Sequence, residues 1–445
     1  MRTSTGNRTP ADLASTVCGV MNRRKLVAPP EQVVVHLFEA LYYTSLKTEE
    51  GQPVRCYVVY LDPKNPDPKP PKRITQDRWS YIPFDKPIPL TADNLAKIAE
   101  ASDPRSSSFA VYADADLRLF IWGIVDQGNS YYDFANRESD RGAARPGVFQ
   151  ASITGVGRVV AYMGYEIIAE LNVNRIVSGS MDVMHYGPVR DKLQQAVDAH
   201  VAAVRASVGG EGFSSRDYWG DYGEDMWFGA LCRLIKRIQG YRHGGTLLVT
   251  DEKAPDNLNV KYGISYSRLR TALLSLATFE TIHDLADNNI YEAFERRETS
   301  ISRELWLKSR VSGNDIDEAK NELDGCLWFI SLLTRVDGLV LLTPNLDVLG
   351  FGVEITVSDP PLKLFAASGP YATERQMKKL EYERYGTRHR SIMRYCATDS
   401  SAIGIVVSQD GHVRVVTQVA DRVVLWESVR LDRFKYSTPD GMRIR

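Results

Sequence analysis

The spacing of hydrophobic positions changes several times along the first half of the chain. Val33, Leu37 and Leu41 recur at every fourth residue, which predicts a helix with one apolar face. The run 54–61 is rich in valine and tyrosine, and it predicts a strand that ends before a proline-dense loop. Residues 109–128 predict two more strands around an aspartate-rich turn. Helices and strands that mix in this way predict an α/β domain.

The next part of the chain predicts the end of this first domain. Residues 188–205 carry valine and leucine on one stripe, which predicts a helix that covers a sheet or links two halves. Residues 209–224 are rich in glycine, aspartate and aromatic residues, a composition typical of a connector. The sequence therefore predicts an N-terminal domain over 1–208 and a linker over 209–224.

Helical and strand-like runs alternate in the second half. The predicted helices are 225–239, 267–285, 322–333 and 373–385, and the predicted strands are 246–250, 339–342, 348–355, 402–408 and 413–416. Strands separated by helices predict an α/β domain with a mixed central sheet flanked by helices. We place this domain at 225–430, with a tail at 431–445. Residues 286–325 are charged in both signs and predict a solvated helical insertion rather than a binding arm.

Composition narrows the classes of function. The 445 residues include 55 Lys and Arg against 56 Asp and Glu, so a generally basic surface for nucleic acid is excluded. The 5 cysteines are scattered without a CxxC spacing, which favours reduced thiols and no zinc site. The sequence has neither an apolar leader nor a run long enough to span a membrane. We therefore expect a soluble, cytoplasmic protein with neither a membrane nor a nucleic acid as partner.

Three segments of the second half carry candidate chemistry. Two glycines before a fully apolar strand, in HGGTLLV, allow a close approach of a ligand to the backbone. Asp337 precedes Gly338 at the start of another strand, where a carboxylate can hold a divalent metal. Arg388 and Arg390, in GTRHR, can each bind phosphate oxygens with two hydrogen bonds. Each segment alone is usually a turn or a surface cluster, but together they predict a site for a nucleotide polyphosphate.

Four segments in this order resemble a known family. They are GGTLLV at 244–249, DGLVLL at 337–342, GTRHR at 386–390 and AIGIVVS at 402–408. The series resembles the diadenylate cyclase domain of DisA-type and DacA-type bacterial proteins, and it covers about 225–420. The N-terminal half, around Tyr42 to Leu61, also resembles the N-terminal part of a related group proposed as nucleotide sensors in bacterial signalling systems.

The resemblance implies a site and a reaction. In such cyclases two ATP-loaded domains face each other, and cyclic di-AMP forms as pyrophosphate leaves. The resemblance places Asp337, Gly338 and Asp410 in catalysis, with Mg²⁺ or Mn²⁺ held by Asp337 and Asp410. The residues implied in nucleotide binding are Gly245, Thr246, Leu247, Gly338, Leu339, Gly386, Thr387, Arg388, His389, Arg390, Ser408 and Gln409. The resemblance is also compatible with a homodimer that forms through these domains.

Departures from the family pattern leave two functions open. Gln409 stands where the family has a glutamate beside the metal, and Leu339 replaces an alanine. Because an amide carries no charge, metal binding is expected to weaken unless Asp410 substitutes. The leading hypothesis is a sensor that binds ATP or a related adenine nucleotide and acts on an effector protein that the sequence does not identify. The alternative is an active diadenylate cyclase.

Overall fold

The computed structural model describes residues 7–65, 80–103, 106–127, 132–133, 148–163, 166–178, 181–209, 218–241, 243–251, 257–298, 300–409 and 411–431. The chain divides into two compact units, and the division falls between Ser180 and Met181. Both units are mixed α/β, as the sequence predicts. No helix within the described ranges is long and apolar enough to cross a membrane.

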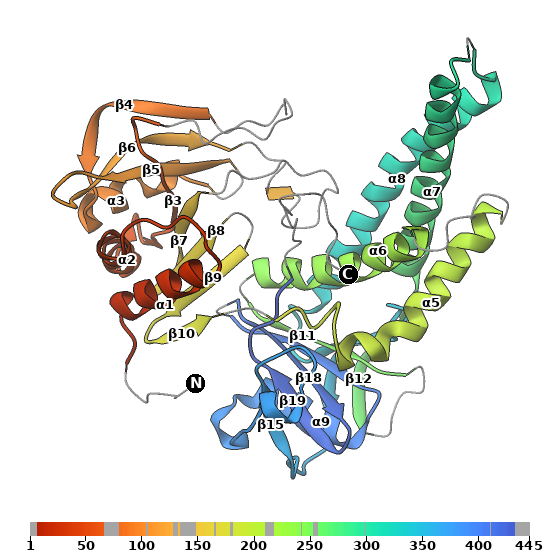
Figure 1. Ribbon diagram of the computed structural model, residues 1–445. Coiled ribbons are helices and arrows are strands. Elements are labelled where there is room, and N and C mark those ends of the chain that lie inside the picture. The colour runs from red at the N-terminus through yellow and green to blue at the C-terminus, as the bar shows by residue number, and fades with distance from the viewer. Residues whose placement is uncertain are drawn as a thin grey trace. The chain divides into compact units, whose positions relative to one another are not determined.

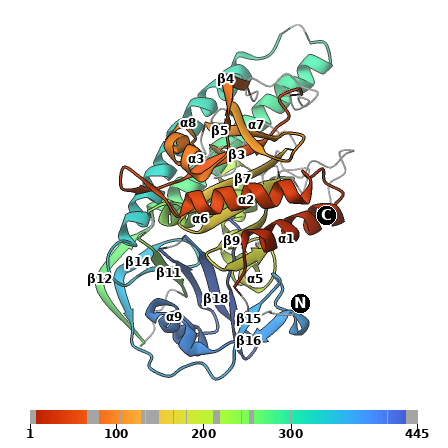
Figure 2. The ribbon, with the colours of Figure 1, turned by 90° about the vertical axis from the view of Figure 1, so that its left-hand side faces the viewer.

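The first unit has an eight-stranded sheet with helices on one face (Figure 2). Its elements are α1 (Pro10–Arg23), α2 (Glu31–Ser45), β3 (Cys56–Tyr60), β4 (Ser80–Pro89), α3 (Ala92–Ile98), β5 (Ser107–Ala113), β6 (Leu119–Asp126), β7 (Phe149–Gly155), β8 (Arg158–Met163), β9 (Glu166–Asn172) and β10 (Arg175–Ser178), with a small hairpin of β1 (Thr48–Glu49) and β2 (Gln52–Pro53). The sheet order is β10-β9-β8-β7-β3-β5-β6-β4. The predicted stripe of Val33, Leu37 and Leu41 is buried against this sheet.

The second unit has a nine-stranded sheet with helices on both faces (Figure 1). Its helices are α5 (Pro188–Val208), α6 (Tyr218–Gly240), α7 (Arg268–Glu295), α8 (Arg303–Leu333) and α9 (Thr387–Thr398). Its strands are β11 (Gly245–Val249), β12 (Leu258–Tyr266), β13 (Leu339–Leu342), β14 (Val348–Ile355), β15 (Leu364–Ala367), β16 (Met377–Lys379), β17 (Ile403–Val407), β18 (Val413–Val419) and β19 (Arg422–Trp426). The sheet order is β12-β14-β13-β11-β17-β18-β19-β15-β16.

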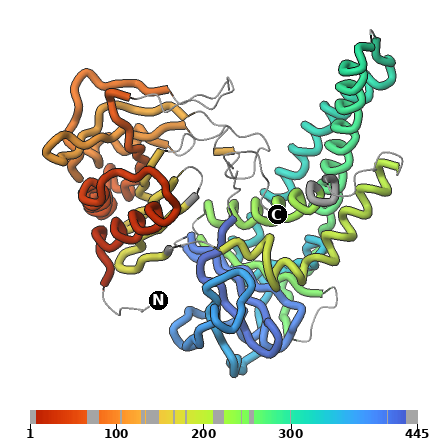
Figure 3. Tube along the Cα trace, in the orientation of Figure 1, coloured from red at the N-terminus to blue at the C-terminus, as the bar shows by residue number. Residues whose placement is uncertain are grey.

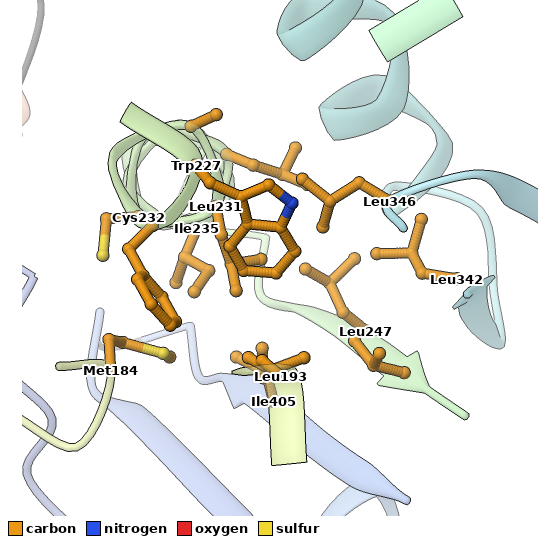
Figure 4. Packing of buried hydrophobic residues seen from close by; sticks show 14 of the residues in the cluster. Met184, Leu193, Trp227, Leu231, Cys232, Ile235, Leu247, Leu342, Leu346 and Ile405 are labelled. Atoms are coloured by element: carbon orange, nitrogen blue, oxygen red, sulfur yellow. The ribbon is translucent and has the colours of Figure 1, made fainter. Parts of the chain in front are cut away.

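Two hydrophobic clusters lie on the two faces of this second sheet. Side chains from α5, α6, α7 and α8 pack on one face, where Trp227, Leu247 and Ile405 lie close together (Figure 4). Helix α9 packs on the other face through Ile392 and Met393. Successive side chains of a strand point to opposite faces, so each central strand contributes to both clusters.

The boundary between the units differs from the predicted one. Helix α5 belongs to the second unit because its apolar stripe packs with α6 and α7 in the same cluster. The predicted linker is helical from Tyr218 onward, where α6 begins, and residues 210–217 lie outside the described part. The predicted tail also lies outside it, apart from Leu431.

The predicted helix at 373–385 is wrong. This segment contains the 3₁₀ turns η3 (Glu374–Gln376) and η4 (Tyr382–Arg384) on either side of the short edge strand β16. The helix begins later, at Thr387, so the Arg-His-Arg segment forms the first turn of α9. The cause is the spacing of Ile392, Met393 and Cys396, which places all three on the face toward the sheet.

Gly404 allows α9 to pack closely on the sheet. A Cβ atom on Gly404 would lie 2.1 Å from Cγ2 of Ile392, which is itself buried. We therefore expect Gly404→Ala to lower the free energy of unfolding by about 1–3 kcal/mol through overpacking. Chemical denaturation checks this, with Gly263→Ala as the control because no atom lies within 4 Å of its added Cβ. Equal losses in both variants would contradict the prediction.

Candidate anion-binding site

The ends of three neighbouring strands meet at one edge of the second sheet. Strands β11 and β13 are parallel, and Leu247 pairs with Val340. Two residues earlier in each segment, Gly245 therefore lies beside Gly338. Strand β17 runs antiparallel to β11, and Val407 pairs with Gly245. Asp337, Gly245 and Ser408 therefore lie at the same edge. Three of the segments that the sequence singles out are brought together by this topology.

The fourth segment, at the start of α9, reaches the same edge. Nη1 of Arg388 donates a hydrogen bond to the carbonyl oxygen of His243, at 3.4 Å. A Cβ atom on Gly244, whose φ is +74°, would lie 2.8 Å from the same nitrogen. The guanidinium of Arg388 therefore lies against the backbone where β11 begins. The N-cap of α9 is Gly386, which provides no side-chain cap, and the first amides of a helix attract anions.

His389 and Arg414 form a pair beside this helix end. Nη1 of Arg414, on β18, lies 3.0 Å from Nε2 of His389. A guanidinium can only donate, so Nε2 accepts this hydrogen bond and the proton of the neutral ring lies on Nδ1. Burial, followed by the charges of Arg414 and Arg388, lowers the pKa of His389 to about 4. His389 is therefore neutral at pH 7, and its cationic neighbours supply the positive charge.

The described structure gives the arginines of this region no acidic partner. Within the described ranges, no carboxylate lies within 4 Å of a side-chain nitrogen of Arg388, Arg390, Arg394 or Arg414. The Nε atoms of Arg394 and Arg414 are buried, and neither has a hydrogen-bond partner among the residues that the structure describes. Arg388 is exposed, whereas Arg390, Arg394 and Arg414 are partly buried. A partly buried guanidinium without a counter-charge is unfavourable unless an anion compensates it. The region therefore has the electrostatic character of an anion site.

Arg414 is the site residue that the sequence does not predict. It lies 25 residues after His389, in a strand whose buried positions are valines and one threonine. The sequence does contain one signal for it. Arg414 lies between Val413 and Val415 in a strand, and because these two valines pack on one face of the sheet, Arg414 must point to the other face. That signal places Arg414 on the α9 face of the sheet, but it does not identify the partner.

Several of the predicted residues have structural roles at this edge. Leu247 and Leu339 are buried in the hydrophobic clusters, so only their backbones are available to a ligand. Gly338 has a φ of +111°, and a Cβ atom there would lie 2.5 Å from the carbonyl carbon of Gly352. Close packing of β14 therefore explains this glycine without a ligand. The Ser408 hydroxyl accepts a hydrogen bond from the backbone of His412, at 3.1 Å.

The predicted metal ligands are described only in part. Asp337 is exposed at the strand end, and a carboxylate is the oxygen ligand that Mg²⁺ and Mn²⁺ prefer. Asp410 lies outside the described residues, and Gln409 precedes it at the end of β17. In the part of the chain that the structure describes, no group of three His, Cys, Asp or Glu residues could hold a metal ion. Among the described residues at these strand ends, Asp337 therefore offers the carboxylate oxygens that suit a divalent ion.

Thr246 presents a buried hydroxyl on the α9 face of β11. It pairs with Val406, which pairs in turn with Arg414, so the three residues form one row across the sheet. Thr246 is 4% exposed, and its Oγ1 has no hydrogen-bond partner among the described residues. An unsatisfied buried hydroxyl destabilises a folded protein, so this one is a candidate contact for a bound ligand.

We expect Thr246→Val to leave the free energy of unfolding unchanged or to raise it by up to about 1 kcal/mol, because it removes an unsatisfied polar group. The matched control is Thr250→Val, since the Thr250 hydroxyl donates to the Asp399 carboxylate at 2.5 Å. Its loss removes one of the hydrogen bonds that this carboxylate accepts, beside those from Tyr395 and Ser401. That control should lose about 1–3 kcal/mol. Denaturant titration of both variants checks the pair. Equal destabilisation would show that the Thr246 hydroxyl has a partner in the ligand-free protein.

Comparison with known proteins gives one match. A family model described as "Probable sensor domain DACNV" matches residues 23–126, which run from the end of α1 to the end of β6. The match lies within the first unit, so this unit is similar to a probable sensor domain. No curated protein and no solved structure matches the chain.

Proposed function

We propose that the second unit binds ATP or a related adenine nucleotide through its polyphosphate, and that the chain acts as a nucleotide sensor or regulatory module. The observation that carries the proposal is the group of four arginines around α9 that have no carboxylate partner in the described structure. Arg388 contacts the backbone at the start of β11, next to the start of β13 where Asp337 lies.

Each group would have a distinct role toward the phosphate chain. Arg388 extends toward the backbone of β11 and would donate to phosphate oxygens, while the first amides of α9 would bind another oxygen. Arg414 would supply a second positive charge and hold His389 with its Nδ1–H as a donor. The Thr246 hydroxyl would gain the hydrogen bond that it lacks. The choice of adenine rests on the resemblance to diadenylate cyclases, and the sensing role is supported by the DACNV match.

A diadenylate cyclase is the second candidate function. It is favoured by the placement of Asp337 and the Arg388 segment on one edge of the sheet. A bound divalent ion would neutralise the charge of the leaving pyrophosphate. The chain's own residues would hold the triphosphate through Arg388 and Thr246.

One experiment separates the two functions. Titration calorimetry with ATP, with and without Mg²⁺ or Mn²⁺, measures binding, and chromatography of the same mixtures detects cyclic di-AMP. Binding without product supports the sensor, and product supports the cyclase. If neither ATP nor any other adenine nucleotide binds, the proposal is wrong.

A further inference from the structure

The helical insertion of the second unit is a long antiparallel hairpin. Helices α7 and α8 lie side by side and extend away from the sheet of their own unit (Figure 3). Small residues line the seam between them near the turn, where Ala286, Ala293 and Ser312 are buried. Nδ1 of His283 donates to the carbonyl of Ser309, at 2.9 Å. Small side chains allow the two helices to approach closely, so the seam provides little space for large apolar groups.

The large apolar side chains near the turn face outward instead. They are Tyr291 (60% exposed), Phe294 (77%), Ile301 (37%), Trp306 (47%), Leu307 (41%) and Val311 (54%), and we refer to them as the hairpin-tip patch. A solvated hairpin normally buries such residues between its helices and exposes polar ones. A group of six exposed apolar residues at the end of one hairpin is typical of an interaction surface.

The charges around the hairpin-tip patch indicate which kind of partner it binds. Arg296 is paired with Glu292 and Glu298, and the guanidinium of Arg310 lies over Trp306. The charges that make no ion pair in the described structure are of both signs, namely Arg297, Arg303, Lys308, Glu295 and Glu304. Because two of these five charges are negative, the patch lacks the uniformly positive surface that binds an anionic membrane or a nucleic acid. A surface with both signs is complementary to itself when two copies meet about a two-fold axis.

We propose that the hairpin-tip patch is a dimer interface that binds the same patch of a second copy of this chain. The two hairpins pack against each other as a four-helix arrangement. The exposed aromatic side chains of each copy cover those of the other, and the unpaired arginines and lysine of one copy face the unpaired glutamates of the other.

Sedimentation velocity over a series of protein concentrations tests the proposal on the full chain. The wild-type protein is expected to dimerise. The double variant Phe294→Glu/Trp306→Glu places like charges in the interface, so its dissociation constant should rise by at least about thirtyfold. Leu362→Glu, at a position that is 95% exposed outside the hairpin, is the matched control and should behave as the wild type. Circular dichroism checks that each variant is folded.

Disulfide formation identifies the surface independently. All five native cysteines are buried, so a disulfide between two copies is expected to form only through a cysteine introduced at the surface. Ser300→Cys, at the turn of the hairpin, is expected to cross-link two copies under mild oxidation, whereas Glu383→Cys on η4 is not. A wild-type protein that is monomeric at every concentration overturns the proposal. A dimer that persists in the double variant also overturns it, because the interface would then lie elsewhere.

Discussion

Arg388→Ala is expected to weaken ATP binding by about ten- to a hundredfold. A charge-assisted hydrogen bond to phosphate contributes about 1.5–3 kcal/mol, and each 1.4 kcal/mol corresponds to a tenfold change in affinity. Arg414→Ala should have an effect of similar size, because it removes charge and also releases His389. The two residues lie on different elements, so the double variant should lose more than either single variant. Titration calorimetry measures all three.

The control for this prediction is Arg384→Ala. Arg384 lies four residues before Arg388, but it is paired with Glu381 at the surface. It therefore reports the effect of removing one positive charge from the region without removing a contact to the ligand. If Arg388→Ala and Arg414→Ala bind ATP as the wild type does, the anion site is not the nucleotide site.

Acidification is expected to destabilise the second unit strongly between pH 6.5 and pH 4. Burial lowers the pKa of His200 to about 4, and burial with Arg414 and Arg388 lowers the pKa of His389 to about 4. Unfolded histidines have a pKa of about 6.5, so within this window the unfolded chain binds two protons that the folded unit excludes. Stability is therefore retained above pH 6.5 and lost as the pH falls. Between pH 7 and pH 4.5 each histidine should contribute a loss of about 2 kcal/mol.

Calorimetric unfolding at several pH values measures this loss. His200→Leu should remove about half of the pH dependence, because His200 is buried on α5 and no described residue forms a hydrogen bond with its Nε2. His36→Gln is the control, since this histidine is on α2 of the first unit. A pH profile that His200→Leu does not change would contradict the assignment.

Much of the second sheet could be predicted from sequence because its central strands are short apolar runs. β11, β13, β17 and β18 all lie within or next to the predicted ranges. α7 and α8 fall largely in segments predicted to be helical, but their length and antiparallel pairing depend on contacts along the whole hairpin. The segment 373–385 has several apolar residues without a sustained helical period. Its structure is set by the pairing of β16, the outermost strand of the sheet, with β15.

The candidate site could likewise be predicted only in part, because some of its contacts depend on how separate elements pack. The sequence identified Arg388, Thr246 and Asp337. The strand register places the segments of Thr246 and Asp337 side by side, and the hydrogen bond from Arg388 to His243 brings the third segment to them. The sequence could not identify Arg414, because its contact with His389 depends on how β18 lies beneath α9. It also assigned Gly338 to ligand access, whereas the backbone of Gly352 lies close enough to require a glycine.

The most direct test of the central claim is hydrogen–deuterium exchange of the full chain with and without saturating ATP. Protection is expected in the first turn of α9 and in the peptides that contain Thr246, Asp337 and Ser408, which belong to separate parts of the sequence but share one sheet edge. Protection confined to other peptides, or no protection at all, would contradict the claim that this edge binds the nucleotide.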